Sequence, residues 1–239
     1  MEREIRNVAV IDIGKTNAKL VLHDLETADD LAVLTTPNIV LNDGPYPHYD
    51  IDHLWRFILE GLVEISHALT VDAISLTTHG ASIALLGPDD LALPVLDYEY
   101  QLDAEFLAAY RDERPDFSET QSPALPGGLN VGAQLAWLEA RFRERFASAE
   151  TILTYPQYWA YRLTGVKALE VTQLGCHTDL WRPVTRDFSS LVDRRGWRGK
   201  FAPLRSAFDE LGPLRPAIRE PMAGDWDIPV FCGIHDSNA

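Results

Sequence analysis

The sequence predicts an α/β fold in which a mixed β-sheet is flanked by helices. Two apolar runs, the first at residues 8–13 and the second ending at Leu22, are separated by a short turn, which is typical of a strand hairpin. A third apolar run at residues 31–35 predicts another strand. An amphipathic helix and a further short strand follow, which is the order of elements expected in an α/β layer.

The helix is predicted over residues 51–69. Asp50 is a good N-cap candidate because its side chain can accept a hydrogen bond from the first turn. Apolar residues then recur at spacings of three and four, which places them on one face of a helix. These residues are Ile51, Leu54, Trp55, Ile58, Leu59, Leu62 and Val63. The strand that follows is predicted at residues 73–76.

The remaining elements are shorter, and turn or helix-end signals separate them. In chain order we expect a hairpin at residues 83–86 and 91–96, a helix from Leu102 that stops before Pro115, a loop over 114–128, a helix from Asn130 with Trp137, Phe142 and Phe146 facing inward, a helix that ends at Gly165, short helices and loops over 182–226, and a strand at 228–232. The loop at 114–128 either covers a pocket or is a plain surface loop.

Composition restricts the class of protein. A content of 46% hydrophobic and 24% charged residues predicts a packed core. The net charge of −15 argues against nonspecific binding to nucleic acid or to an anionic membrane, although local N–H groups and cations can still bind ATP. No apolar run is long enough to span a membrane, and the N-terminus is unlike a signal peptide. Cys176 and Cys232 fit reduced thiols, so we expect a cytoplasmic protein.

The turn between the first two strands could bind phosphate. Its residues are Gly14, Lys15, Thr16 and Asn17. Gly14 lets an anion approach the backbone, consecutive N–H groups can point at it, and the Thr16 hydroxyl can donate as well. Lys19 adds positive charge, and Asp12 at the strand end could hold Mg²⁺ directly or through water. The spacing is not that of a Walker A loop. The alternative is an ordinary hairpin in which Gly14 and Asn17 only serve the turn.

Two further motifs lie where strands end, which is where open α/β folds bind ligands. His79 follows the strand at 73–76 and could hydrogen-bond a sugar hydroxyl, or it could only cap the loop. Asp236 follows the strand at 228–232, and a carboxylate at such a turn can accept a proton during catalysis. The alternative for Asp236 is that it only caps a following helix.

The opening segment "DIGKTNAK" resembles the first phosphate motif of the superfamily that contains sugar kinases, actin and Hsp70. The segments "TTHGAS", "TYPQYWAYRLTG" and "GIHDSNA" are similar to segments of the FGGY carbohydrate kinases, such as those for xylulose, fuculose and rhamnulose. The resemblance implies a ribonuclease-H-like, or actin-like ATPase, lobe, and three adjacent antiparallel strands at its start agree with that fold.

The resemblance also implies roles for individual residues. Asp236 matches the catalytic base of these kinases, and His79 matches a histidine that contacts the sugar. Residues 98–100 stand where xylulose kinases have Trp-Asn-Asp, so Glu99 and Tyr100 are expected sugar contacts. His177 lies in the place of a segment that faces the sugar. The departure at residues 98–100 suggests a different sugar or a rearranged sugar pocket. A threonine at 78 and a glutamine at 134 also depart from the usual methionine and lysine.

Residues 1–239 correspond to the first lobe of an FGGY kinase, the one that binds sugar and carries the base. The second lobe, with the adenosine pocket, is absent from this sequence, so we expect the isolated chain to be inactive. The chain is therefore either a truncated protein or part of a longer one.

The expected function is ATP-dependent phosphorylation of a hydroxyl of a sugar, a ketose or a related polyol, with Mg²⁺. Two alternatives stay open at this point. One is a sugar-binding lobe without catalysis, and the other is a lobe of a non-kinase ATPase of the same superfamily that binds a partner. No nucleic-acid or membrane partner is expected, and a homodimer is compatible with the sequence.

Overall fold

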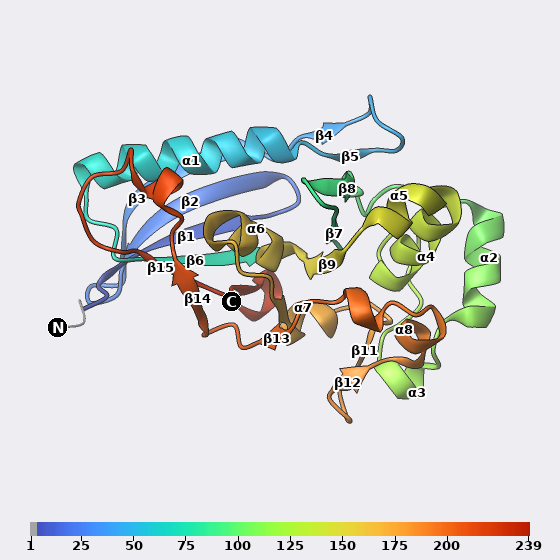
Figure 1. The fold of residues 1–239 in the computed structure, drawn as a ribbon. Helices are drawn as coiled ribbons and strands as arrows, with labels where there is room; N and C mark the ends of the chain where they lie inside the picture. The colour runs from blue at the N-terminus through green and yellow to red at the C-terminus, as the bar shows by residue number, and fades with distance from the viewer. Residues whose placement is uncertain (1–3) are drawn as a thin grey trace.

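A computed structural model describes residues 4–239, and in it a seven-stranded mixed sheet forms the largest layer (Figure 1). The strand order is β14-β15-β6-β1-β2-β3, and β16 also pairs with β6. The strands β1, β2 and β3 are antiparallel neighbours, whereas β6 runs parallel to β1, β15 and β16. Their bounds are β1 (Asn7–Ile13), β2 (Asn17–Asp24), β3 (Asp29–Pro37), β6 (Ala73–Thr78), β14 (Glu210–Pro213), β15 (Pro229–Phe231) and β16 (Ile234–His235). The predicted mixed sheet is confirmed.

Alternating burial explains the opening hairpin. Ala9, Ile11 and Ile13 of β1 are at most 1% exposed, while the residues between them are only half-buried. This period of two is that of a strand with one face on the core. The third strand is longer than the predicted 31–35, because its pairing with β2 extends over residues 29–37.

Helix α1 (Ile51–Ala68) lies along the sheet (Figure 1) and begins as predicted. The Asp50 carboxylate accepts a hydrogen bond of 2.9 Å from the backbone N–H of His53. The buried face of the helix carries Leu54, Ile58 and Leu62. Their spacing of four residues keeps one apolar stripe against the strands.

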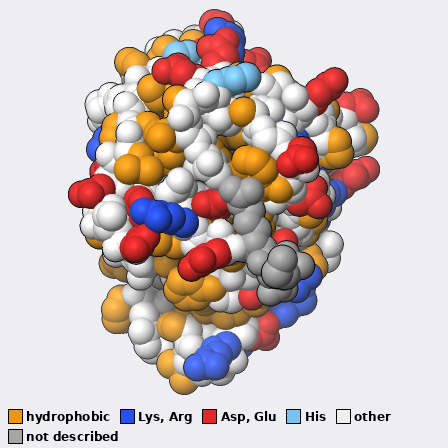
Figure 2. Space-filling view, turned by 90° about the vertical axis from the view of Figure 1, so that its left-hand side faces the viewer, with side chains coloured by type: hydrophobic (Ala, Val, Ile, Leu, Met, Phe, Trp, Pro, Cys, Tyr) orange, Lys and Arg blue, Asp and Glu red, His pale blue; other side chains and the backbone are white. Residues whose placement is uncertain are grey.

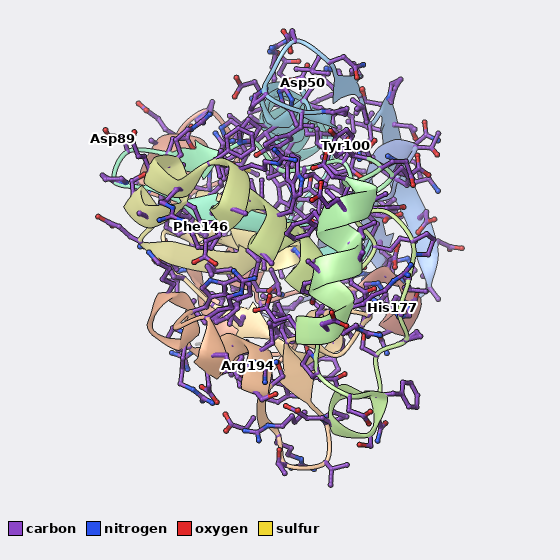
Figure 3. All side chains as sticks on the ribbon, turned by 90° about the vertical axis from the view of Figure 1, so that its right-hand side faces the viewer. Asp50, Asp89, Tyr100, Phe146, His177 and Arg194 are labelled. Carbon is purple, nitrogen blue, oxygen red and sulfur yellow. The ribbon has the colours of Figure 1, made fainter. Side chains whose placement is uncertain are left out.

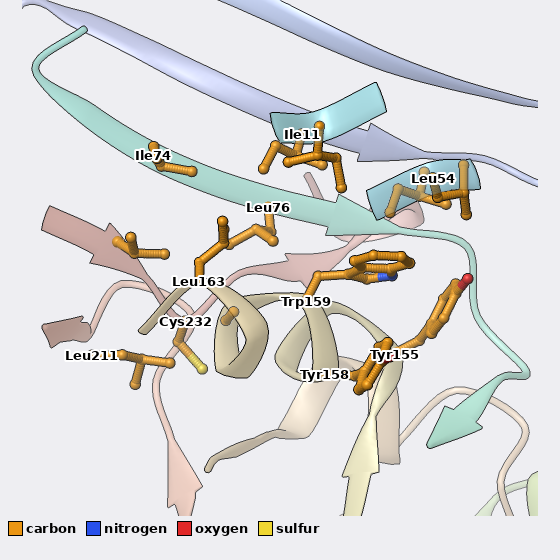
Figure 4. Packing of buried hydrophobic residues seen from close by; sticks show 14 of the residues in the cluster. Ile11, Leu54, Ile74, Leu76, Tyr155, Tyr158, Trp159, Leu163, Leu211 and Cys232 are labelled. Carbon is orange, nitrogen blue, oxygen red and sulfur yellow. The ribbon is translucent and has the colours of Figure 1, made fainter. Parts of the chain in front are cut away.

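Helix α6 (Tyr155–Thr164) packs into the same core and meets α1. Trp159 is fully buried, and its ring stacks on that of Trp55 at a centroid distance of 6.4 Å. Figure 4 shows Trp159 and Leu163 of α6 pointing toward β6. The helix ends at Gly165, whose φ of +87° favours glycine, as the sequence predicts.

A second core lies beside the main sheet, on the right of Figure 1. It is built from β7 (Ile83–Leu86), β8 (Leu91–Leu93), β9 (Thr151–Thr154), α2 (Ala104–Glu113), α4 (Val131–Arg141) and α5 (Arg143–Ser148). Trp137 is buried here, as expected, and its indole N–H donates to Asp103 at 2.8 Å. The single helix predicted from Asn130 through Phe146 is instead two helices, because the backbone leaves the helical region at Phe142.

The loop predicted at 114–128 contains one short helix, α3 (Phe117–Thr120). Polar contacts tie this segment to its surroundings. The Arg114 guanidinium donates to the Ser122 carbonyl at 2.8 Å and to the Asp179 carboxylate at 2.6 Å. The Asn130 side chain accepts from the backbone N–H of Leu125 at 2.8 Å. The segment is thus anchored to the second core.

The other elements are short. They are β4 (Val40–Leu41), β5 (His48–Tyr49), β10 (Leu169–Glu170), α7 (Val171–Leu174), β11 (Trp181–Arg182), β12 (Asp187–Phe188), α8 (Ser190–Arg194), η1 (Arg198–Lys200), β13 (Leu204–Arg205), α9 (Pro216–Arg219) and η2 (Asp236–Asn238). The prediction of only helices and loops over 182–226 is wrong, because this range also holds the short strands β12 and β13 and the strand β14, which is an edge strand of the main sheet. With Gly212 and Pro213 among its four residues it has no alternating pattern, and pairing with β15 makes it a strand.

Acidic side chains are spread over the face seen in Figure 2 and do not gather in one patch there. This distribution is consistent with the net charge of −15. Within residues 4–239, no helix has the length and apolar character needed to cross a membrane.

Replacing Gly233 by alanine should destabilise the protein. This residue joins β15 to β16 with a φ of +85°, and a Cβ there would lie 2.7 Å from the Leu76 carbonyl oxygen. Left-handed strain and steric overlap together should lower the free energy of unfolding by roughly 2–5 kcal/mol. Gly196→Ala is the matched control, because Gly196 has a φ of +70° with open space around it and so isolates the strain of about 1–2 kcal/mol. Equal losses in urea unfolding of the two variants would refute the steric account.

Candidate active site

The register of the main sheet brings three distant segments to one edge. Asp12 of β1 lies opposite Lys19 of β2 and opposite Thr77 of β6. His79 follows the end of β6, and Asp236 follows the end of β16. Since β1, β6 and β16 are parallel, their carboxyl ends share the edge at which open α/β folds bind ligands. The structure therefore brings Asp12, His79 and Asp236 to the same edge of the sheet.

A cavity of about 470 Å³ opens at this edge. Five separate segments of the chain contribute to its wall. The lining residues are His79, Gly80, Ala81, Tyr98, Leu129, Cys176, His177, His235, Asp236, Ser237 and Asn238. Three of the site residues expected from the sequence, at positions 79, 177 and 236, thus share one cavity.

His79 is held as a neutral hydrogen-bond acceptor. It is 4% exposed, and its Nδ1–H donates to the Gly80 carbonyl at 2.8 Å. Because the imidazole is neutral, the other nitrogen, Nε2, carries a lone pair, and it is buried without a partner. Burial lowers the pKa of His79 to about 4. An unpaired buried acceptor in a cavity wall suits the hydroxyl of a bound molecule.

Aromatic rings surround this histidine. The rings of Tyr49, Tyr98 and Tyr155 lie at centroid distances of 5.1, 5.3 and 5.0 Å from the ring of His79. Tyr49 and Tyr155 are buried, whereas Tyr98 is half-buried and lines the cavity. This packing fixes the orientation of the imidazole.

Asp236 is not held as a helix cap. The residue that precedes the short 3₁₀ turn η2 is His235, and Asp236 lies inside its first turn. One Asp236 oxygen, Oδ1, is 3.3 Å from His235 Nε2 and accepts from the Ser237 hydroxyl at 3.3 Å. With 37% of its side chain exposed, Asp236 can receive a proton from a molecule in the cavity.

Asp12 and Asp236 interact electrostatically. Burial raises the pKa of Asp12, the Lys19 cation lowers it, and the Asp236 carboxylate raises it again. The hydroxyl of Thr77, opposite Asp12 in the register, is buried without a partner. Within residues 4–239, no group of three or more His, Cys, Asp and Glu side chains could enclose a metal. One or two carboxylates still fit a Mg²⁺ ion that keeps several waters and binds phosphate oxygens.

The predicted phosphate turn is held by hydrogen bonds within the turn and from Asn38. The Gly14 N–H closes the turn on the Asn17 carbonyl at 2.9 Å. Asn38 donates from its side chain to the Gly14 carbonyl at 2.9 Å and from its backbone to the Thr16 carbonyl at 2.8 Å. The side chains of Thr16, Asn17 and Lys19 are exposed. The turn is thus tightly held, and its polar groups are open to an anion.

The side chain of Lys15, expected at the phosphate, lies beside the cavity wall. Its ammonium pairs with Asp97 and lies 3.3 Å from the carboxylate of Glu99. The expected sugar contact Glu99 is therefore an ion-pair partner, with 65% of its side chain exposed.

Tyr100 does not belong to the cavity lining. Its ring packs on that of Trp137 at 5.6 Å, and Tyr98 takes the place at the cavity. The Tyr100 N–H donates a backbone hydrogen bond of 2.9 Å to the Asp97 carbonyl. This bond closes a turn over residues 97–100, and the two tyrosine side chains leave that turn toward different neighbours. Figure 3 shows Tyr100 and His177 well apart. His177 is exposed at the cavity, with a φ of +56° and its carbonyl held by the Asn130 side chain at 2.9 Å.

Sequence reasoning missed Tyr98, Cys176 and His235 as cavity residues. For His235 the available signal was Gly80, because a side chain at that position would collide with the histidine ring. A Cβ on Gly80 would lie 2.6 Å from His235 Nε2 and 3.6 Å from the sulfur of Cys176. The glycine after His79 therefore permits the close approach of two distant segments.

Comparisons with known proteins agree with this architecture. The model of the FGGY family of carbohydrate kinases, N-terminal domain, matches residues 7–239. The crystal structure of a carbohydrate kinase from Novosphingobium aromaticivorans is 43% identical, with a TM-score of 0.91, over 96% of this chain and 50% of that chain. A xylulose kinase from Lactobacillus acidophilus has the same fold, with a TM-score of 0.86 at 17% identity over 98% of this chain and 49% of its own.

Two curated relatives are named rhamnulokinase. The one from Pectobacterium atrosepticum is 23% identical over 239 residues, covering 94% of this chain and 45% of its own length. The one from Bacteroides thetaiotaomicron is 26% identical over 174 residues, covering 70% of this chain and 36% of its own length. The chain thus spans at most about half the length of these relatives.

We expect the His79 imidazole to remain neutral when the pH falls to about 5, because burial lowers its pKa from 6.5 to about 4. Between pH 6.5 and 4 the unfolded chain binds the proton more readily than the folded one. The free energy of unfolding should then fall by up to about 1.4 kcal/mol per pH unit through this residue. NMR titration of the histidine ring signals measures the pKa, and His79→Gln assigns the signal. A His79 signal that titrates near pH 6.5 would contradict this account.

Proposed function

Because the chain belongs to the FGGY family of carbohydrate kinases, we propose that the complete protein transfers the γ-phosphoryl group of ATP to a hydroxyl of a ketose or related polyol. The main support is one cavity that holds an exposed carboxylate, Asp236, and an unpaired buried acceptor, His79 Nε2. The phosphate turn follows β1 at the same edge of the sheet. The proposed substrate and phosphate sites are thus neighbours.

Asp236 is the proposed general base. As the sugar hydroxyl oxygen attacks the γ-phosphorus, its proton passes to the Asp236 carboxylate, and the bond from phosphorus to the ADP oxygen breaks. Contacts with His235 and Ser237 orient this carboxylate. Positioning of the two reactants supplies much of the rate enhancement in such transfers.

Asp12 is the proposed carboxylate for Mg²⁺, which when bound neutralises charge on the phosphate oxygens. The burial that raises the pKa of Asp12 makes its charged form costly, so a cation beside it is favoured. The N–H groups of the turn after Gly14, the Thr16 hydroxyl and the Lys19 ammonium are the proposed phosphate contacts.

Sugar recognition is assigned to the cavity wall. We propose that His79 Nε2 accepts a hydrogen bond from one sugar hydroxyl, while the Tyr98 ring covers an apolar face of the sugar. His177 at the cavity can contact a further hydroxyl. Because the ring of Tyr100 packs on Trp137, the aromatic contact is proposed for Tyr98 in its place.

The isolated chain is proposed to bind sugar without turnover. The cavity that carries the proposed sugar contacts lies within this chain. The relatives are about twice as long. ATP hydrolysis that no sugar stimulates would instead favour an ATPase that binds a partner.

The Asp236→Asn variant of the complete protein should lose about 10²–10⁴-fold in kcat, the usual scale for a general base, with the fold intact. ADP release by the parent protein with Mg²⁺-ATP and a panel of ketoses and polyols identifies the substrate. The same assay with that substrate then measures the loss of kcat in the variant. Asp89→Asn is the control, because Asp89 is exposed in the β7–β8 turn, away from the cavity (Figure 3). Near-normal turnover by Asp236→Asn would remove this residue from the role.

A further inference from the structure

The ammonium group of Lys15 lies against residues 97–99, of which Tyr98 lines the cavity, although the Lys15 backbone belongs to the turn after β1. It pairs with the Asp97 carboxylate and lies 3.3 Å from that of Glu99. It also lies over two aromatic rings, 5.1 Å from the centroid of Tyr49 and 5.0 Å from that of Tyr98. One cation thus contacts both the acidic and the aromatic side chains of residues 97–99.

Asp97 is the more buried of the two acidic partners, at 8% exposure. Its Oδ1 accepts hydrogen bonds from the Tyr49 hydroxyl at 3.3 Å and from the Glu99 N–H at 3.1 Å, and it also contacts the Lys15 ammonium. A buried carboxylate that loses its cation is strongly unfavourable. Lys15 therefore stabilises the charge around which residues 97–99 are folded.

This cluster reaches the proposed sugar site through Tyr98. The Tyr98 ring lines the cavity and packs edge-on against His79 at 5.3 Å. His79 in turn presents its unpaired Nε2. A displacement of residues 97–99 would consequently move one wall of the cavity and loosen the histidine behind it.

A phosphate role for the Lys15 side chain conflicts with these contacts. Turning the ammonium toward a phosphate would leave the buried Asp97 carboxylate without its cation. Lys19 has no such constraint, because its side chain is exposed opposite Asp12. The two lysines of the motif are therefore suited to different tasks.

We propose that Lys15 is a positioning residue of the sugar cavity: it fixes residues 97–99 and the Tyr98 ring against His79, and Lys19 is the lysine that serves the phosphate. The inference rests on the proposed function in one respect, namely that this cavity is the sugar site. The Lys15 side chain thus links the predicted phosphate turn to the cavity wall.

Hydrogen exchange of the ligand-free, full-length protein tests the positioning role without any reference to activity. In Lys15→Met, the amides of residues 97–100 should exchange roughly tenfold faster or more, since a buried charge has lost its partner. Adding Asp97→Asn removes that charge and should restore much of the protection. Lys19→Met, the matched control, should leave these amides unchanged. Unchanged exchange in Lys15→Met would overturn the proposal, even if no sugar were ever phosphorylated.

Kinetics with D-xylulose and L-rhamnulose as probes then separate the two lysines. Lys15→Met should raise the KM for the sugar roughly 10- to 100-fold and leave the KM for Mg²⁺-ATP within about twofold. Lys19→Met should act mainly on ATP and on kcat. A raised KM for ATP with an unchanged KM for sugar in Lys15→Met would make Lys15 a phosphate ligand and refute the inference. If Lys15→Met does not fold, the double variant Lys15→Met with Asp97→Asn is measured in its place. Its KM for sugar and the exchange rates of amides 97–100 should then lie near those of the parent protein, and large increases in both would refute the charge-pairing account.

Discussion

The hydrogen-bonded pairing of β6 is the constraint on which the rest of the structure depends. This strand lies between β1 on one side and β15 and β16 on the other, all parallel to it. Its register places Thr77 level with both Asp12 and Ile234. A shift of one residue would turn every side chain of the strand to the opposite face, so the register also sets the geometry of the site. Motifs that lie more than 150 residues apart thereby share one edge.

Close backbone approach is the second requirement, and two glycines meet it. Gly233 leaves room for the Leu76 carbonyl between β6 and β16, and Gly80 leaves room for the ring of His235. A side chain at either position would separate the segments that carry His79 and Asp236. Small residues next to the functional ones are therefore part of the construction of the cavity.

Electrostatic balance within an acidic protein shapes the same region. Asp236 is close enough to raise the pKa of Asp12, so a cation beside the two carboxylates would be favoured. Asp97 is balanced by Lys15 within the protein itself. His79 stays uncharged because it is buried. The net charge of −15 thus gives little guidance on the local charge that a substrate would meet.

Local features of the sequence determined the opening hairpin, the helix capped by Asp50 and the helix that ends at Gly165, because alternation, spacing and caps depend on neighbouring residues. They also placed His79 and Asp236 at strand ends. Only the tertiary structure decided three features. Tyr98 faces the cavity in place of Tyr100, the Lys15 ammonium lies against Asp97, and β14 joins the main sheet. Each of these depends on contacts between segments far apart in the chain, such as the pair of Lys15 and Asp97, which are 82 residues apart. Local patterns do not encode such contacts.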